Sequence, residues 1–208
     1  MTIASFLKLV EIQTKVASMI PFLIGTVYTL WRYDRLNPMN LLFMFISLLA
    51  FDMVTTAINN YIDYKKAQKR HGYGYERHNA IVKYNLKETT VVFVIIILLT
   101  IAILFGILLF LNTNFVILIL GAVSFAVGIL YSFGPIPISR MPLGEIFSGL
   151  FMGFVIPFIA IYVHVYDNNI AFLTYANGML GININIMDVL IIFLVSVPAV
   201  SGIANIML

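Results

Sequence analysis

Residues 40–63, NLLFMFISLLAFDMVTTAINNYID, place acidic and amide side chains inside and at the end of a long apolar run. Asp52, Thr56, Asn59 and Asp63 follow one another at i, i+4, i+7 and i+11, which puts all four on one face of a helix. Because such groups are costly to bury in an apolar helix, they favour an ion or substrate site within the membrane. A helix cap or a solvated helix end is the alternative interpretation of the terminal amides.

The composition indicates an integral membrane protein. Of the 208 residues, 62% are hydrophobic and 10% are charged, with a mean hydropathy of +1.02. A soluble domain would have about a quarter of its residues charged. Cysteine is absent, which excludes disulfides, thiolate zinc sites and cysteine nucleophiles.

Six apolar segments approach the length of about 20 residues that spans a bilayer. We therefore predict an all-α fold, a polytopic transmembrane helix bundle of about six spans, forming a single domain over residues 1–208. The segment from His164 to Met187 is expected to form an outer loop, with room for a short interfacial helix. The predicted spans are 16–31, 40–62, 90–111, 115–133, 145–165 and 186–208.

The distribution of lysine and arginine predicts the orientation of these spans. If the chain alternates across the bilayer, ten of these residues share one side and only Arg32 and Arg35 lie opposite. We therefore expect a multi-pass protein of the cell membrane, with the N-terminus and the site-bearing loops cytoplasmic. Asp63, the basic loop after it and Arg140 then meet at the cytoplasmic face.

This convergence favours a site for a metal–diphosphate. Mg²⁺ prefers oxygen ligands and commonly bridges one or two carboxylates to phosphate oxygens, and lysine and arginine neutralise the remaining phosphate charge. A second cluster, residues 131–145, combines prolines and glycines with Arg140 and Glu145, and a structural turn between two spans is its simplest interpretation. Gly149 and Gly153, four residues apart, predict close helix packing in the fifth span.

Four blocks of sequence resemble the UbiA-type intramembrane prenyltransferases, in particular the branch that prenylates 1,4-dihydroxy-2-naphthoate in menaquinone synthesis. The block at the end of the second span is the most specific of the four. The blocks are Glu11–Lys15 with Pro21 and Gly25, Asn59–Asp63, His78–Ile81, and Tyr131–Gly149.

The resemblance implies a helix bundle that transfers a polyprenyl group from polyprenyl diphosphate to an aromatic acceptor, with Mg²⁺ as cofactor. It implies that Asn59 and Asp63 hold the metal, with Asp63 catalytic, and that Tyr131 borders the reacting end of the prenyl chain. The expected partners are the two substrates and the lipid bilayer, and no nucleic acid is expected. The residues implied to bind the diphosphate are Lys15, Asn60 and Arg140.

The sequence also departs from the family pattern. Asn60 replaces an aspartate of the usual motif, Ala67 stands where a further aspartate often follows, and Gly134 and Pro135 stand where some branches have a lysine. The family carries a second aspartate-rich motif, which would come at about the point where this chain ends. We therefore expect an incomplete, N-terminal portion that is inactive or weakly active on its own.

Three other functions remain open at this point. Another aromatic acceptor, such as a hydroxybenzoate, haem or a phenolic ring, would keep the reaction class. An ion or solute transporter fragment would use Asp52 and Asp63 as relay residues. A non-catalytic membrane scaffold would tolerate alanine at Asp52, Asn59 and Asp63.

Overall fold

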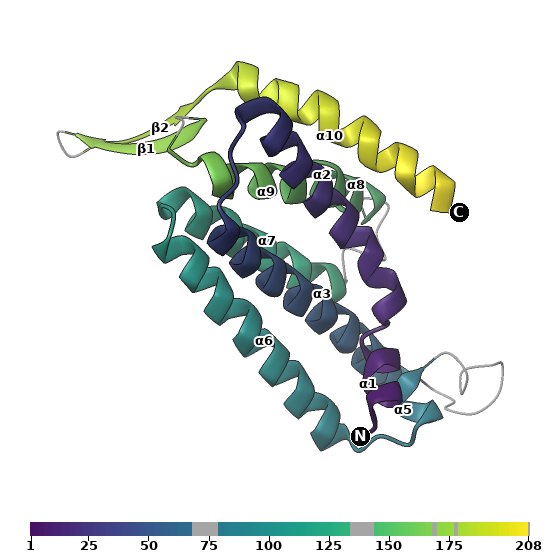
Figure 1. Cartoon of the computed structure of the whole chain (residues 1–208). Helices are drawn as coiled ribbons and strands as arrows, with labels where there is room; N and C mark the ends of the chain where they lie inside the picture. The colour runs from purple at the N-terminus through teal and green to yellow at the C-terminus, as the bar shows by residue number, and fades with distance from the viewer. Residues whose placement is uncertain (68–78, 134–143, 168–169, 177–178, 208) are drawn as a thin grey trace.

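The protein is a bundle of long helices with a β-hairpin at one end (Figure 1). The computed structural model describes residues 1–67, 79–133, 144–167, 170–176 and 179–207. Its helices are α1 (Ile3–Leu9), α2 (Val16–Tyr33), α3 (Pro38–Lys66), α5 (Ala80–Lys83), α6 (Glu88–Leu111), α7 (Phe115–Ser132), α8 (Gly144–Leu150), α9 (Ile156–Val165) and α10 (Ile186–Met207). The shorter elements are the 3₁₀ turn η1 (Ile12–Lys15), the π-helical turn η3 (Phe151–Val155) and the strands β1 (Ala171–Ala176) and β2 (Met179–Ile184).

Helices occupy all six predicted spans, and the predicted helix bundle is confirmed. Helices α2, α3, α6, α7 and α10 each correspond to one span, and α8, η3 and α9 together form the fifth. Among the described residues, α3 and α6 each have the length and composition to cross a membrane, and the later helices carry shorter apolar stretches. The hairpin is an addition to the predicted all-α fold.

Helix α3 is the longest element, and local sequence fixes its start. The Asn37 side chain accepts hydrogen bonds from the backbone N–H groups of Met39 and Asn40, and Pro38 occupies the first turn, where no N–H is needed. Along its length α3 packs against α6, while the opposite side of α6 exposes apolar side chains such as Phe93. This exposed side suits contact with lipid, and α3 is held in the interior of the bundle.

The fifth span is not a uniform α-helix. The π-helical turn η3 separates α8 from α9, and Pro157 lies in the first turn of α9. Proline has no N–H to give to the preceding turn, and π-helical turns are one of the ways in which helices adjust where the regular hydrogen-bond pattern is interrupted. Phe151 and Met152 of this turn face the cavity described below.

Helices α2 and α9 cross at close range because of Gly25. A Cβ atom built on Gly25 would lie 2.6 Å from the carbonyl oxygen of Pro157 and 2.7 Å from Cβ of Ala160. Of the two glycines predicted to pack the fifth span, Gly153 lies against Val197 of α10, whereas no described residue of another element lies within 4 Å of the Cβ position of Gly149. The packing prediction is therefore correct for Gly153 and wrong for Gly149.

The predicted outer loop contains a β-hairpin in place of the suggested interfacial helix. Strands β1 and β2 pair antiparallel, with Ala171 opposite Ile184. The sequence between them is Asn177-Gly178, a pair typical of two-residue hairpin connections. The hydroxyl of Tyr162 in α9 donates a hydrogen bond to the carbonyl of Ala171, which ties the base of the hairpin to the bundle.

Candidate active site

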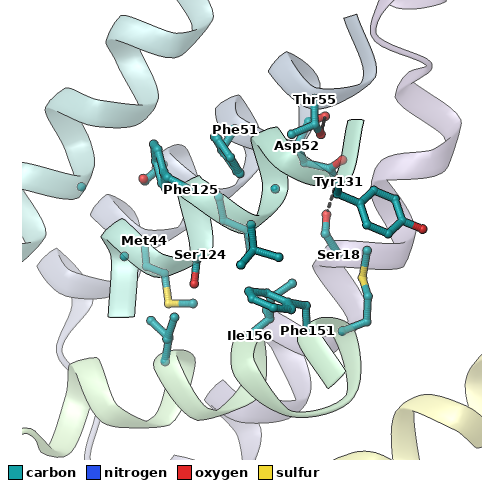
Figure 2. Close-up of a pocket in the computed structure, with 18 of the residues that line it drawn as sticks. Ser18, Met44, Phe51, Asp52, Thr55, Ser124, Phe125, Tyr131, Phe151 and Ile156 are labelled. Atoms are coloured by element: carbon teal, nitrogen blue, oxygen red, sulfur yellow. Dashed lines mark hydrogen bonds between the residues drawn. The ribbon is translucent and has the colours of Figure 1, made fainter. Parts of the chain in front are cut away.

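A cavity of about 360 Å³ lies between α3 and α7, with α2, α6 and the η3–α9 segment contributing to its walls (Figure 2). Met44 and Asn59 of α3 both line it, so the cavity extends roughly 22 Å along the helix axis at 1.5 Å per residue. The walls at the end near Met44 are mainly apolar, with Ser47 and Ser124 as polar exceptions. The apolar residues include Leu48, Leu109, Ile117, Ile156 and Ile159.

The opposite end of the cavity is polar. The side chains of Asp52 and Thr55 come from the middle of α3, and Tyr131 comes from the last turn of α7 (Figure 2). On the predicted orientation this polar end lies toward the cytoplasm. Its polar lining residues are Ser18, Asp52, Thr55, Thr56, Asn59 and Tyr131.

A buried ion pair organises this polar end. Lys15 is 3% exposed, and its Nζ lies 2.7 Å from Oδ1 of Asp52 and 2.6 Å from Oγ1 of Thr56. The second carboxylate oxygen of Asp52 accepts a hydrogen bond from Ser18. A buried ammonium requires both a counter-charge and hydrogen-bond acceptors, and the spacing of Asp52 and Thr56 on α3 supplies them. Lys15 therefore joins η1 to the centre of α3.

The structure brings together three of the four residues of the predicted ladder. Asp52, Thr56 and Asn59 border the cavity, with Tyr131 across from them on α7. Asp63 lies one turn beyond Asn59 and is exposed, outside the cavity lining. The predicted site therefore begins in the cavity at Asn59 and continues along α3 toward solvent at Asp63.

Asn60, predicted to bind diphosphate, lies on another face of α3. It is 8% exposed, and its side-chain amide donates hydrogen bonds to the carbonyl of Leu9 at 2.9 Å and to Oε1 of Glu11 at 3.3 Å. Its backbone carbonyl accepts a hydrogen bond from the Asn79 side chain. Adjacent residues on a helix point about 100° apart, which is why Asn59 faces the cavity and Asn60 faces α1. In this structure Asn60 therefore holds α1 and Asn79 in place and does not line the cavity, and its role in binding diphosphate stays a prediction.

The other two residues predicted to bind diphosphate have different outcomes. Lys15 lies beside the polar end of the cavity, but Asp52 and Thr56 engage its ammonium group. Lys15 holds the Asp52 side chain in place at the polar end of the cavity, but Lys15 itself is not one of the lining residues. Arg140 lies outside the described residues, so its prediction stays untested.

The sequence-based prediction missed Ser18 and Thr55. Ser18 follows Lys15 by three residues, so one helical turn places both side chains against Asp52. Thr55 donates a hydrogen bond to the carbonyl of Asp52 and lines the cavity. The spacing of Ser18 from Lys15 was the available signal, but its meaning depends on knowing that α2 packs beside Asp52.

The donor set fits a hard divalent cation only in part. Asn59 and Asp63 are one turn apart on one face of α3 and offer the oxygen ligands that Mg²⁺ prefers. The carboxylate of Asp52 is already neutralised by Lys15. No group of three histidine, aspartate or glutamate side chains that could hold a metal occurs in the described part of the chain. A divalent ion at Asn59 and Asp63 would therefore need further oxygen atoms, such as those of a substrate diphosphate.

Comparison with known proteins identifies the family. Residues 18–203 match the UbiA prenyltransferase family. The 1,4-dihydroxy-2-naphthoate octaprenyltransferase of Bacillus subtilis (strain 168) is 32% identical over 154 residues, which cover 73% of this chain and 48% of that protein. This chain therefore spans about half the length of its curated relative, and no solved structure gives a significant match. The match covers every helix that borders the cavity, and the chain belongs to the UbiA prenyltransferase family of integral membrane helix bundles.

Proposed function

We propose that the protein transfers a polyprenyl group from polyprenyl diphosphate to an aromatic acceptor, and that the acceptor is 1,4-dihydroxy-2-naphthoate. The observation that carries the proposal is the cavity: a long apolar space that ends in a cluster of oxygen-bearing side chains. A prenyl chain fits the apolar part, and its charged diphosphate fits the polar end. The similarity to the Bacillus naphthoate octaprenyltransferase supports the choice of acceptor.

Mg²⁺ would be held by Asn59, Asp63 and the diphosphate oxygens. When bound, it would neutralise charge on the diphosphate as that group leaves. The chain itself orients the substrates: Lys15 and Ser18 fix Asp52, and Tyr131 borders the reacting end of the prenyl chain. Loss of diphosphate from the donor would leave an allylic cation that the electron-rich ring of the acceptor attacks, and the ring would regain its aromaticity by releasing its carboxyl group as carbon dioxide. Exclusion of water from the cavity would keep water from reacting with the cation.

The proposal places the protein in the cell membrane, with the polar end of the cavity toward the cytoplasm. The distribution of lysine and arginine supports this orientation. Asp52 is engaged by Lys15, so a metal held at Asn59 and Asp63 would draw on a single aspartate of α3. We therefore propose that the 208-residue chain alone turns over slowly, and the tests below measure substrate binding.

Asn59→Ala tests the proposed metal–diphosphate site. In lipid nanodiscs we expect the chain to bind radiolabelled farnesyl diphosphate in a Mg²⁺-dependent manner. Loss of one charge-assisted oxygen contact should weaken that binding about tenfold or more. Asn112→Ala is the matched control, because Asn112 is exposed at the far end of α6 and its side chain donates a hydrogen bond to the carbonyl of Leu108 in that helix.

Two outcomes would contradict the proposal. If Asn59→Ala bound farnesyl diphosphate as tightly as the wild-type chain, Asn59 would not be part of the metal–diphosphate site. A cation flux through vesicles that depends on Asp52 and Asp63, without Mg²⁺-dependent diphosphate binding, would favour a transporter. Competition between 1,4-dihydroxy-2-naphthoate and a hydroxybenzoate during transfer would identify the acceptor.

A further inference from the structure

Gly121 is a glycine whose presence the packing of the protein does not explain. It lies within α7, and a Cβ atom built on it would have no atom within 4 Å from the described residues beyond its own helix backbone. Glycine in a helix interior costs roughly 1 kcal/mol relative to alanine. By contrast, a Cβ on Gly128 of the same helix would lie 2.5 Å from the ring of Phe51. Close helix contact therefore accounts for Gly128 but not for Gly121.

The space beside Gly121 belongs to the cavity. Gly121 is one of its lining residues, and so are Gly128 and Tyr131 on the same helix. Ten residues separate Gly121 from Tyr131, so Gly121 lies roughly 15 Å from the polar end along the helix axis. Because Gly121 lines the cavity and its Cβ position is open, a larger side chain at residue 121 would take up part of the cavity volume.

Contacts between α3 and α7 agree with this position of Gly121 far from the polar end of the cavity. The rings of Phe51 and Phe125 stack with their centroids 4.0 Å apart, and the Cβ position of Gly128 lies 3.7 Å from Thr55. The two helices therefore run in the same direction, with Phe51 beside Phe125 and Thr55 beside Gly128. Gly121 precedes Phe125 by four residues, so it lies about one turn closer to the Met44 end of the cavity. It borders the segment of the cavity beyond the aromatic pair.

We propose that Gly121 determines the length of prenyl chain that the protein accepts. The absence of a side chain there keeps the apolar half of the cavity open, so that a long chain extends past the Phe51–Phe125 pair. This inference rests on the proposed function, because it assumes that the cavity holds the prenyl chain. On this inference, Gly121 of α7 sets the limit on the length of the prenyl chain.

Gly121→Leu tests the inference with prenyl diphosphates of two, three, four and eight isoprene units, bound to the chain in nanodiscs with Mg²⁺. Short donors should bind as they do to the wild-type chain. Donors that reach past the aromatic pair should bind at least about tenfold more weakly, because the isoprene unit that is displaced loses its apolar burial.

Gly149→Leu is the matched control. Gly149 is also a helix glycine with open space at its Cβ position, but it is exposed and does not line the cavity. Its variant should bind every donor as the wild-type chain does. A Gly121→Leu profile that equals the wild-type profile at all lengths would overturn this inference alone. Failure of the wild-type chain to bind any prenyl diphosphate would overturn the proposed function as well.

Discussion

Asp52→Ala is expected to lower the free energy of unfolding by about 3–5 kcal/mol, because it leaves Lys15 buried without its counter-charge. Lys15 is 3% exposed and lies 2.7 Å from Asp52, so its ammonium group would keep only neutral acceptors, the Thr56 hydroxyl and the backbone carbonyl of residue 52. Ser18 loses its acceptor at the same time. Denaturant titration in detergent micelles, followed by circular dichroism, measures the change.

The double variant Lys15→Met, Asp52→Leu separates charge from packing. Removal of both charges eliminates the cost of burying them, so the double variant should be clearly more stable than Asp52→Ala. It should still bind Mg²⁺–diphosphate poorly, because the polar end of the cavity would lose its organising pair. If the single and double variants were equally unstable, the ion pair would not be the reason for the loss.

Gly25→Leu is expected to destabilise the protein by about 3 kcal/mol through overpacking. The atoms that its Cβ would approach include the backbone oxygen of Pro157, 2.6 Å away, which cannot move unless α9 moves. Because α9 carries Ile156 and Ile159 of the cavity wall, the displacement should also weaken binding of the prenyl donor. Thermal unfolding in nanodiscs provides the measurement.

Gly121→Ala is the matched control for the change at Gly25. Both residues lie within helices, but the Cβ of an alanine at residue 121 would have no described residue of another element within 4 Å. That variant should be as stable as the wild-type chain or slightly more stable, since alanine favours the helix. Equal stability of Gly25→Leu and Gly121→Ala would show that the α2–α9 crossing is looser than the structure indicates.

The helices and part of the site could be predicted from the sequence. Long apolar runs define spans because backbone groups in lipid must bond within their own helix, and the predicted spans match the observed helices closely. The position of Asp52 within an apolar run also indicated a polar site inside the bundle, because an isolated carboxylate there would be too costly. The structure shows that Asp52 pairs there with Lys15.

The remaining features depend on tertiary packing, which residue spacing does not specify. Asn59 and Asn60 are chemically identical, and only the position of α1 decides that Asn60 bonds Leu9 while Asn59 faces the cavity. Gly149 and Gly153 share the spacing of a packing pair, yet only Gly153 lies against α10. The pair Asn177-Gly178 is typical of a hairpin connection. The surrounding segment has no lysine or arginine and was therefore interpreted only as an outer loop.

Photo-crosslinking with a prenyl diphosphate that carries a diazirine at the end of its chain tests the central claim most directly. The claim is that the cavity between α3 and α7 holds the chain, with the diphosphate at Asn59. Peptide mapping should then find the label on residues of the apolar walls, such as Leu109 and Ile117, only when Mg²⁺ is present. Label confined to the lipid-exposed side of α6, at Phe93 and its neighbours, would contradict it.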